Sequence, residues 1–315
     1  MKFVFGVDVG GTTIKIGLFN MDKKLILTDV IKTNKKAKGA FILKEIAQKI
    51  KQIMKEKLLI EENILGVGFG VPGPVVNNFV IWCPNIGWKD LYLEKEFIKE
   101  LGFKTTIIAT NDATAAAFGE FVYLKEEKNM AFLTLGTGVG GGLVIDGKIV
   151  EGSNGSAGEF GHLQVEYINP IKCSCGLYGC LETVASIRGI NGLAENILKN
   201  NTLLTRLTLN NLNPREIFYY AKNDDIVALK IVETLGDYIA KAAAKIALSV
   251  DPEVIVVGGG ISNAGSILTS VIKKSYKKYS YFGTRKLKFR LAKLKNDAGM
   301  YGASELIFQN QIKWR

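Results

Sequence analysis

Two stretches of the sequence repeat one pattern, in which an apolar strand, a glycine-rich turn and a second strand follow one another. The turns are Gly10-Gly11-Thr12-Thr13 and Gly136-Thr137-Gly138-Val139-Gly140-Gly141-Gly142. Around them we expect strands at residues 2–8, 14–19 and 24–31 in the first stretch and at 131–135 and 143–145 in the second. A pattern that recurs in this way predicts an internal duplication, so we expect two related α/β halves.

The segments between and after the two turns alternate between helical and strand periodicity. Helices are expected at residues 41–58, 91–101, 113–124, 183–199, 214–222 and 226–250 and from 299 onward, and further strands at 64–71, 105–109, 254–257 and 287–291. No low-complexity tract or linker interrupts this series, so the halves are expected to pack closely around a cleft. We expect a smaller N-terminal α/β domain of residues 1–112 plus about 300–315, and a larger C-terminal α/β domain of residues 113–299.

The composition is that of a globular protein. The 315 residues are 47% hydrophobic, which is enough to bury a core in about two domains. No stretch approaches the roughly 20 apolar residues that span a bilayer, and the N-terminus starts on a strand pattern rather than on a cleavable signal. We therefore expect a cytoplasmic protein that has no membrane partner.

The chain carries 41 Lys and Arg against 30 Asp and Glu, which gives a formal net charge of +11. Such a balance is compatible with an acidic partner such as nucleic acid. The lysines are dispersed over amphipathic segments, however, and the densest group, at residues 273–278, suits a solvated helix face. We therefore expect no nucleic-acid partner.

His162 is the only histidine, and three of the four cysteines, Cys173, Cys175 and Cys180, follow it in one short loop. Three thiolates and one imidazole make a closed tetrahedral set for Zn²⁺ and leave no open position for an activated water. Cysteines in the core or in a disulfide are the alternatives. They fit poorly because two glycines indicate a tight, polar loop, and because cytoplasmic thiols tend to bind metal. We expect a structural zinc ion here and a free, partly buried thiol at Cys83.

A third glycine cluster, Gly258-Gly259-Gly260, follows the strand expected at 254–257. At a strand end, the backbone amides of glycines can bind phosphate without a side chain in the way, so three such turns suggest a nucleotide. Asp8, before the first turn, could hold a magnesium-bound water, and Thr12 and Thr137 could donate to phosphate oxygens. None of the turns matches the Walker or dinucleotide patterns, and two hairpins with a strand-to-helix turn are the alternative interpretation.

Asp112 follows a predicted strand and begins an alanine-rich helix. For an isolated Asn-Asp pair, helix capping is the ordinary role. The small residues at 113–117 would let another backbone segment approach closely, which a cap alone does not require. A carboxylate in this position could instead orient an alcohol and accept its proton during phosphoryl transfer.

Together these motifs resemble those of the ROK family of sugar kinases and repressors. The matching segments, which extend over nearly the whole chain, are Asp8-Val-Gly-Gly-Thr-Thr-Ile-Lys15, Asn111-Asp112-Ala-Thr-Ala-Ala-Ala, Leu135-Gly-Thr-Gly-Val-Gly-Gly-Gly, Gly158-Glu-Phe-Gly-His162 and Cys173-x-Cys-Gly-x-x-Gly-Cys-Leu-Glu182. Within the family, the segments at 151–159 and 181–186 look most like those of bacterial glucokinases. The resemblance implies the actin/hexokinase-like (ribonuclease-H-like) duplicated fold, with two α/β domains around a cleft.

The resemblance also implies roles for individual residues, with Asp112 as the general base for the sugar hydroxyl. The residues that would bind the sugar are Gly73, Asn85, Asn111, Asp112, Glu159, His162 and Glu182. Those that would bind ATP are Asp8, Gly10, Gly11, Thr12, Thr13, Lys15, Gly136, Thr137, Gly138, Gly258, Gly259 and Gly260. One ring nitrogen of His162 would bind zinc with Cys173, Cys175 and Cys180, and the other would face the sugar.

The activity implied by the resemblance is ATP-dependent phosphorylation of glucose at its 6-hydroxyl, which gives glucose 6-phosphate. Its cofactors would be ATP, Mg²⁺ and a structural Zn²⁺, and the chain would form a homodimer or homotetramer. A kinase for N-acetylmannosamine, N-acetylglucosamine, fructose or allose is the main alternative, because pocket shape decides between hexoses. The donor could also be ADP or polyphosphate. A sugar-sensing repressor is a remote alternative, since such repressors carry an added N-terminal helix-turn-helix and few residues precede Asp8.

Overall fold

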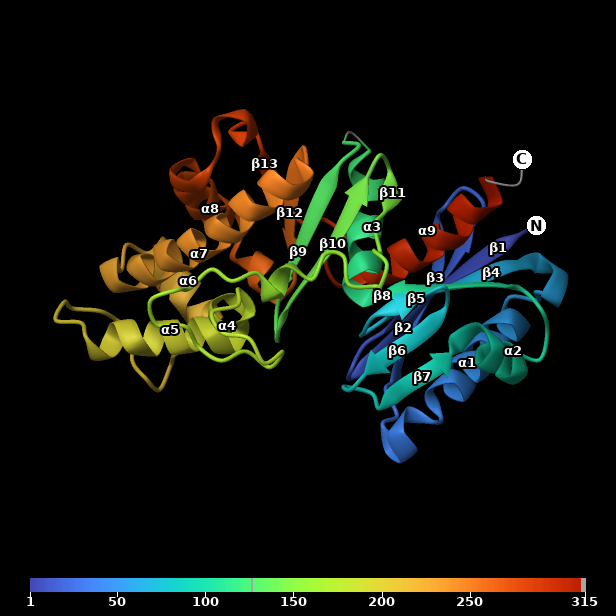
Figure 1. Cartoon of the computed structure of the whole chain (residues 1–315). Coiled ribbons are helices and arrows are strands. Elements are labelled where there is room, and N and C mark those ends of the chain that lie inside the picture. Colours follow the sequence, from blue (N-terminus) through green and yellow to red (C-terminus); the bar gives the residue numbers. More distant parts are fainter. Residues whose placement is uncertain (126, 313–315) are drawn as a thin grey trace. The chain divides into compact units, whose positions relative to one another are not determined.

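The computed structural model describes residues 1–125 and 127–312, and its contacts divide them into two compact units (Figure 1). The first unit comprises residues 1–125, 149–157 and 296–312, and the second comprises residues 127–148 and 158–295. The domain boundary expected after Asp112 falls one residue into a helix that the contacts assign wholly to the first unit.

The first unit is built on a five-stranded sheet in the order β3-β2-β1-β4-β8. Its strands are β1 (Phe3–Val9), β2 (Thr13–Asn20), β3 (Leu25–Lys32), β4 (Ile64–Val71) and β8 (Thr106–Asn111). The first three form the predicted antiparallel meander, and β4 and β8 continue the sheet parallel to β1. The strands expected in this part of the sequence are thus confirmed.

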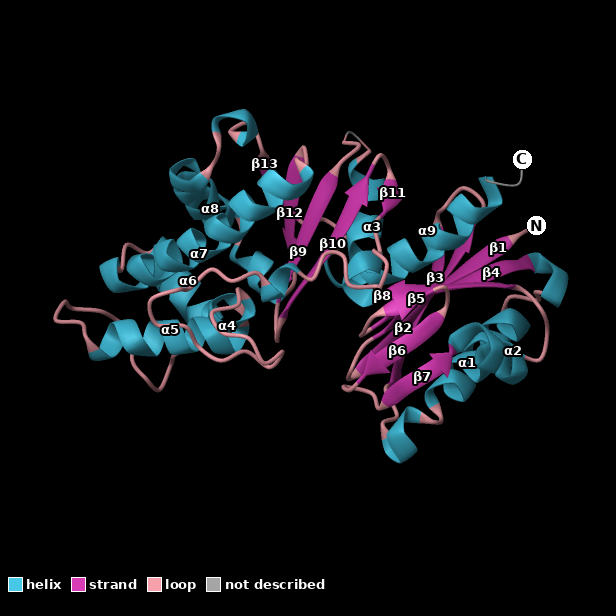
Figure 2. Cartoon of the chain, viewed as in Figure 1, coloured by secondary structure: helices cyan, strands magenta, loops and turns pink. Residues whose placement is uncertain are grey.

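Helices cover both faces of this sheet (Figure 2). They are α1 (Ile42–Glu56), α2 (Leu93–Leu101), α3 (Asp112–Leu124) and α9 (Ala298–Ile312). Successive side chains of a strand point to opposite faces. Accordingly, Phe5 belongs to the core shared with α1 and α2, whereas Val4 packs with Ile307 of α9 on the other face.

Glycines in β4 let two helices approach the backbone of the sheet. Gly66, Gly68 and Gly70 alternate with larger side chains, so all three lie on the face covered by α9 and α3. A Cβ at Gly68 would overlap the backbone of α9, and one at Gly70 would lie 3.0 Å from Ala115 Cβ in α3. Because the glycines leave this face of β4 without side chains, the first turn of α3, which carries Asp112, packs directly on the sheet.

A small antiparallel sheet in the order β5-β6-β7 lies between β4 and β8 in the sequence. Its strands are β5 (Val75–Val76), β6 (Phe79–Cys83) and β7 (Trp88–Tyr92). The sequence analysis predicted no strand here, because the apolar runs of this segment are too short to display a period.

The second unit repeats the topology of the first, with a five-stranded sheet in the order β11-β10-β9-β12-β13. Its strands are β9 (Met130–Leu135), β10 (Val139–Ile145), β11 (Lys148–Ile149), β12 (Val254–Gly258) and β13 (Lys288–Leu291). Again one strand forms an antiparallel hairpin with the central strand, and two parallel strands follow on its other side. This shared order confirms the internal duplication predicted from the two glycine turns.

Two expectations for the second unit need correction. β10 begins at Val139 rather than at 143, because glycines 140–142 continue the ladder with β9 instead of forming a loop. The single helix expected at 183–199 is two helices, α4 (Glu182–Ala185) and α5 (Ile187–Lys199), separated by Ser186. The backbone of Ser186 is extended and its side chain accepts a hydrogen bond from the Gly189 amide, so this residue caps α5.

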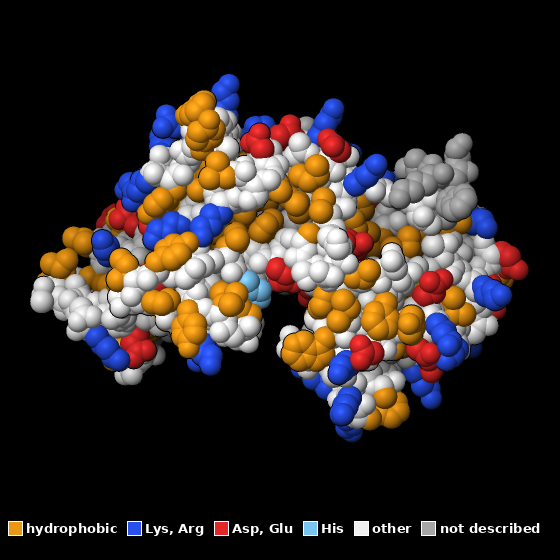
Figure 3. Space-filling view, viewed as in Figure 1, with side chains coloured by type: hydrophobic (Ala, Val, Ile, Leu, Met, Phe, Trp, Pro, Cys, Tyr) orange, Lys and Arg blue, Asp and Glu red, His pale blue; other side chains and the backbone are white. Residues whose placement is uncertain are grey.

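The helices α6 (Pro214–Lys222) and α7 (Ile226–Val250) match their predicted bounds. A further helix, α8 (Ser266–Tyr279), lies between β12 and β13 in the sequence. Of the described helices, none combines the length and apolar character required to cross a membrane. On the face seen in Figure 3, Lys and Arg side chains are scattered among acidic, apolar and polar groups, in agreement with the dispersed lysines of the sequence.

Candidate functional site

Asn111 and Asp112 stand where β8 ends and α3 begins. Asn111 is the N-cap of α3, since its Oδ1 accepts hydrogen bonds from the amides of Ala113 at 2.9 Å and Thr114 at 3.2 Å. Asp112 Oδ1 also accepts a bond from the Ala113 amide, at 2.8 Å. The capping role considered for Asp112 is thus filled by Asn111.

Gly73 lies against the same helix start. Asn111 Nδ2 donates a hydrogen bond to the Gly73 carbonyl at 3.3 Å. A Cβ at Gly73 would stand 2.7 Å from Cys83 Sγ and would overlap the backbone of Trp82, so only glycine fits. The Cys83 thiol is fully buried rather than partly buried. Burial raises its pKa to about 12, and the nearby Asp112 carboxylate adds to the rise, so Cys83 is a neutral neighbour of Asp112.

Asn85 is exposed in the connection between β6 and β7. The buried Trp88 anchors this connection, because its Nε1 donates a hydrogen bond to the Gly39 carbonyl at 3.1 Å. A Cβ at Gly11, in the first glycine turn, would lie 3.9 Å from Asn85 Cβ. The fold therefore brings a predicted sugar ligand beside a predicted phosphate-binding turn within the first unit.

The first glycine turn joins β1 to β2 and is closed by hydrogen bonds that involve the backbone. The Gly10 amide donates to the Thr13 carbonyl at 3.0 Å. Thr33, which follows β3, donates from Oγ1 to the Gly10 carbonyl at 2.7 Å and from its amide to the Thr12 carbonyl at 2.9 Å. These bonds fix the turn, while the side chains of Thr12 and Thr13 are exposed.

Asp8, near the end of β1, lies among charged groups. Lys15, its cross-strand neighbour, donates to Asp297 Oδ1 at 2.8 Å and to the Asn296 carbonyl at 2.6 Å. A Cβ at Gly299, in the first turn of α9, would lie 2.7 Å from the Asp8 carboxylate. Burial raises the pKa of Asp8 to about 6; the Lys15 ammonium opposes this rise and the Asp297 carboxylate adds to it.

A divalent cation would relieve the cost of ionising Asp8, and carboxylate oxygens are ligands that Mg²⁺ prefers. Asp8 therefore fits the magnesium role predicted for it. The sequence analysis missed Asp297, although a signal was present. The run Asn296-Asp297-Ala298 at the start of α9 repeats the run Asn111-Asp112-Ala113 at the start of α3.

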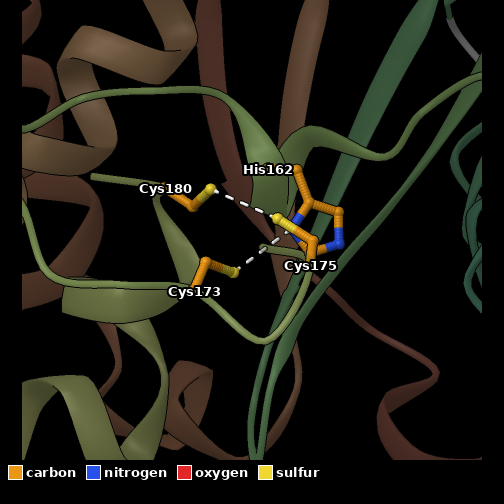
Figure 4. Close-up of side chains that lie close together, drawn as sticks. All are labelled: His162, Cys173, Cys175 and Cys180. Atoms are coloured by element: carbon orange, nitrogen blue, oxygen red, sulfur yellow. Dashed lines mark hydrogen bonds between the residues drawn. The ribbon is translucent and has the colours of Figure 1, made fainter. Parts of the chain in front are cut away.

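In the second unit, His162, Cys173, Cys175 and Cys180 gather in one cluster (Figure 4). Their ligand atoms all lie within 4.8 Å of one another. Cys173 Sγ lies 3.6 Å from His162 Nδ1, and Cys175 Sγ lies 3.8 Å from Cys180 Sγ. Gly176 and Gly179 in this loop have φ values of 93° and 73°. These left-handed backbone conformations favour glycine and are typical of a tight turn.

These spacings match the shell of a tetrahedral zinc ion. Zn–S bonds of about 2.3 Å and Zn–N bonds of about 2.1 Å give tetrahedron edges of about 3.8 Å between sulfurs and about 3.6 Å between sulfur and nitrogen. The four residues therefore fit Zn²⁺, with His162 Nδ1 as the imidazole ligand. Nε2 of the ring, which then carries the proton, lies 3.9 Å from Glu159 Oε2, so it faces another predicted sugar ligand.

Glu182 begins α4, two residues after the metal-binding Cys180. Its Oε1 accepts a hydrogen bond from Ser174 Oγ at 3.3 Å, and its Oε2 accepts one from the Val139 amide at 3.0 Å. The carboxylate thus contacts both the cysteine loop and the start of β10. The sequence analysis did not foresee the contact with Val139, since Glu182 and Val139 are distant in the chain.

The second and third glycine turns lie next to each other in the second unit. The Ile187 amide donates a hydrogen bond to the Gly136 carbonyl at 2.8 Å, which ties the start of α5 to the second turn. Gly259 has a φ of 79°, and a Cβ there would overlap the backbone of Leu135, the residue before Gly136. The fold thus brings together two turns that the sequence analysis assigned to one nucleotide.

Two pockets open beside these turns. One, of about 620 Å³, lies between α6 and the turn after β12 and is lined by residues that include Arg215, Tyr219, Lys222, Gly260 and Asn263. The other, of about 520 Å³, is lined by Thr137, Ile187, Arg188, Asn191, Gly192 and Glu195. Pockets of this size hold small ligands, and the mixture of aromatic and cationic side chains in the first pocket suits a base and its phosphates. Of the residues that line these pockets, the sequence analysis predicted only Gly260 and Thr137 as nucleotide ligands. The pocket residues on α5 and α6 come close to the turns only in the folded chain.

A model of the ROK family matches residues 4–310 of the chain. A glucokinase from Halalkalibacterium halodurans is 37% identical over 98% of this chain and 96% of its own length. A ROK family glucokinase from Streptomyces griseus, whose structure was solved in complex with glucose and AMPPNP, aligns with a TM-score of 0.76 and 28% identity over 98% of this chain and 99% of that chain.

A putative xylose repressor from Caldicellulosiruptor is also similar, with 26% identity over 98% of this chain and 79% of its own length. The match extends through both units, as the motifs of the sequence predicted. The actin/hexokinase-like α/β fold expected from those motifs is confirmed by the structural similarity and by the shared order of the two sheets.

Proposed function

The chain belongs to the ROK family, and we propose that it transfers the γ-phosphoryl group of MgATP to the 6-hydroxyl of glucose. The observation that carries this proposal is the 37% identity to a glucokinase over nearly the full length of both chains. A related glucokinase was solved with glucose and an ATP analogue, which supports both substrates. The products are glucose 6-phosphate and ADP.

In this proposal Asp112 is the general base. Its carboxylate accepts the proton of the sugar hydroxyl while the hydroxyl oxygen bonds to the γ-phosphorus and the bond to the ADP oxygen breaks. The contact with the Ala113 amide supports this role, because it fixes the orientation of the carboxylate at the start of the helix. Because Asn111 caps α3, the carboxylate of Asp112 is not needed to begin the helix.

The phosphates of ATP are bound in this proposal by backbone amides of the glycine turns, with the hydroxyls of Thr12, Thr13 and Thr137 and the Lys15 ammonium as further donors. Fixed donors stabilise the charge that spreads over the transferring group. Mg²⁺, when bound, would supply further neutralisation of that charge, and Asp8 is the residue that would hold it.

The second unit contributes Glu159, His162 and Glu182, which we assign to the sugar hydroxyls, and the first contributes Asn111, Gly73 and Asn85. Zinc is structural in this proposal, and it fixes the ring of His162 through Nδ1. The Nε2 proton is then available to a hydroxyl oxygen of the sugar. We assign the third glycine turn and the neighbouring pocket on α6 to the adenosine.

A kinase for another hexose is the second candidate. Selection at individual sugar carbons depends on the shape of the pocket. A repressor is the third candidate, supported by the 26% identity to a putative xylose repressor. We further propose a cytoplasmic homodimer or homotetramer. Three thiols grouped around one imidazole support the cytoplasm, since reducing conditions keep thiols available for metal.

The test is a coupled assay in which the purified chain is offered glucose, N-acetylmannosamine, N-acetylglucosamine, fructose and allose, each with ATP, ADP or polyphosphate. We expect the highest kcat/KM with glucose and ATP. Turnover of an N-acetylated hexose ten times better than glucose, which corresponds to about 1.4 kcal/mol, would overturn the substrate assignment. A chain that binds sugar but phosphorylates none of these sugars would favour the repressor.

A further inference from the structure

The carboxylate of Glu182 joins two segments of the second unit that are far apart in the sequence. On one side, Oε1 accepts a hydrogen bond from Ser174 Oγ at 3.3 Å, and Cys173 Sγ lies 4.0 Å from the same oxygen. On the other side, Oε2 accepts a hydrogen bond from the Val139 amide at 3.0 Å. One side chain therefore connects the metal-binding loop with the residue that directly follows the second glycine turn.

The turn is shaped to receive this carboxylate. A Cβ at Gly138 would stand 2.5 Å from Glu182 Oε2, so the carboxylate occupies the space that a side chain at this position would need. Within the turn, the Gly136 amide donates to the Gly138 carbonyl at 2.9 Å. Glu182 thus contacts the end of a hydrogen-bonded turn, at the residue where β10 begins.

A second hydrogen bond to the glycine turn comes from the same stretch of chain. The Ile187 amide donates to the Gly136 carbonyl at 2.8 Å, and Ile187 lies only five residues beyond Glu182. The backbone between them forms α4 and the cap of α5. Both contacts that hold the second turn from outside therefore originate just after Cys180, which is one of the four metal-binding residues.

The metal-binding residues also flank the groups that make the connection. Ser174 lies between Cys173 and Cys175, and Glu182 is the second residue after Cys180. When Zn²⁺ binds the three cysteines, it fixes the backbone at both places. Without the metal, the Ser174 hydroxyl and the Glu182 carboxylate lose this constraint on their spacing, so their contacts loosen together.

We propose that Ser174 and Glu182 are positioning residues through which the zinc-ordered loop fixes the second glycine turn, so that zinc occupancy sets the affinity for ATP as well as for the sugar. This inference rests on the proposed function and extends it, because the family resemblance assigns Glu182 to the sugar only. It predicts that the metal loop affects nucleotide binding even when no sugar is present.

The experiment measures the binding of a non-hydrolysable ATP analogue with Mg²⁺, by calorimetry, in the strict absence of sugar. Wild type is compared with Ser174→Ala, Ser174→Thr and Glu182→Ala and with wild type from which zinc has been removed by a chelator. We expect the affinity to fall at least about tenfold in Glu182→Ala and in the zinc-free protein, since a charged acceptor is lost or displaced. In Ser174→Ala we expect a loss of about threefold, because this hydrogen bond is exposed.

Ser174→Thr keeps the hydroxyl and is expected to restore the wild-type affinity, which a purely steric effect at residue 174 would not do. Ser249→Ala on α7 is the matched control, since Ser249 is an exposed serine that donates to a backbone carbonyl at 2.9 Å. Zinc content and melting temperature are measured on each preparation. The analogue affinity of a variant is compared with that of wild type only when the variant retains the wild-type zinc content, so that loss of a side chain is not confused with loss of metal.

Analogue affinity within twofold of wild type in Glu182→Ala, in Ser174→Ala and in the zinc-free protein would overturn the inference, even if glucose binding fell. Failure of the proposed function has a different signature. In that case wild type would not phosphorylate glucose, whatever the loop variants do to nucleotide binding.

Discussion

The run Asn-Asp-Ala begins both α3 and α9, and each of these helices follows the last strand of one of the two similar sheets. The two aspartates nevertheless have different surroundings. Asp112 lies on the glycine face of β4, beside the buried Cys83, with Asn111 as the cap of its helix. Asp297 is half exposed and forms an ion pair with Lys15. The duplicated junction thus places one carboxylate beside the buried Cys83 and the other between Lys15 and Asp8.

The two glycine turns differ in a similar way. The first is closed by backbone bonds and by Thr33, and it lies beside the charged groups around Asp8. The second is held from outside by Glu182 and Ile187, which follow the metal-binding loop. The two halves therefore contain the same hairpin, and each copy of the hairpin is held by different residues that pack against it. The following predictions test how far this difference extends.

The largest expected effect separates the two aspartates. Asp112→Asn keeps the shape of the side chain but cannot accept a proton, so kcat should fall at least about 10²-fold while glucose and ATP still bind. Asp297→Asn, the matched variant in the second copy of the motif, should keep most of its kcat. Steady-state kinetics and calorimetry on both variants check this.

If Asp112→Asn retained more than a tenth of the wild-type kcat, Asp112 would not be the base and the two copies would be functionally alike. Asn111→Ala provides a control for capping. It should lower the free energy of unfolding by about 1 kcal/mol, because it removes the cap that Asn111 supplies.

Removal of zinc tests whether the second unit depends on its metal. Purified protein should contain one zinc per chain, and Cys175→Ser should contain much less, because one of four ligands is lost. Glucose affinity should fall by about tenfold or more, since His162 and Glu182 are fixed by the loop. Elemental analysis and calorimetry measure both quantities. Wild-type protein with well under one zinc per chain would refute the metal assignment.

The charge cluster of the first turn should appear in the dependence of stability on pH. Because the pKa of Asp8 is about 6 in the folded chain and 3.8 for an unperturbed aspartate, folding is favoured by the protonated form. This contribution is fully present below pH 4 and is lost as the pH rises through 6. Asp8→Asn should therefore be more stable than wild type at pH 7, by up to about 3 kcal/mol, and the difference should shrink below pH 4.

Urea denaturation of the two proteins at several pH values, without added Mg²⁺, gives this difference directly. Activity should move in the opposite direction, because Asp8→Asn cannot hold Mg²⁺ as a carboxylate does. A wild type that is more stable than Asp8→Asn at pH 7 would show that ionised Asp8 stabilises the fold instead of straining it.

The smallest effect is expected for the ion pair between Lys15 and Asp297. The side chains are 22% and 50% exposed, so water and salt screen their attraction. Asp297→Asn should change the free energy of unfolding by less than about 1 kcal/mol at neutral pH, and less still at high salt. Denaturation at low and high ionic strength checks this. A loss of several kcal/mol would mean that the two copies of the motif are equally important for folding.

Most regular elements could be predicted from the sequence, because their apolar periods are long. The helices at 214–222 and 226–250 and the strand at 64–71 match their predicted bounds. The β5–β7 sheet could not, since two- to five-residue strands are defined by their pairing partners. The same applies to the break at Ser186, where the hydrogen bond to the Gly189 amide replaces continued helix.

For the site, the sequence named the metal-binding residues, because four chemically specific side chains share one loop. It also named Asp112, but it could not tell whether Asp112 or Asn111 caps α3, since both residue types cap helices equally well. It missed Asp297 and the contact of Glu182 with Val139. These groups act on residues that are more than 40 positions away in the chain, and such proximity is not encoded in a local pattern.

The sequence by itself determined the duplicated α/β plan, the zinc-binding set and the three glycine turns, because each depends on residue types at fixed, short spacing. Only the tertiary structure decided which copy of a motif does what. The neighbouring Cys83 and the glycine face of β4 distinguish Asp112 from Asp297, and the bond to Val139 gives Glu182 its place against the second turn. The neighbouring charges, packing contacts and hydrogen-bond partners of a side chain depend on residues that are distant in the sequence, and only folding brings those residues together.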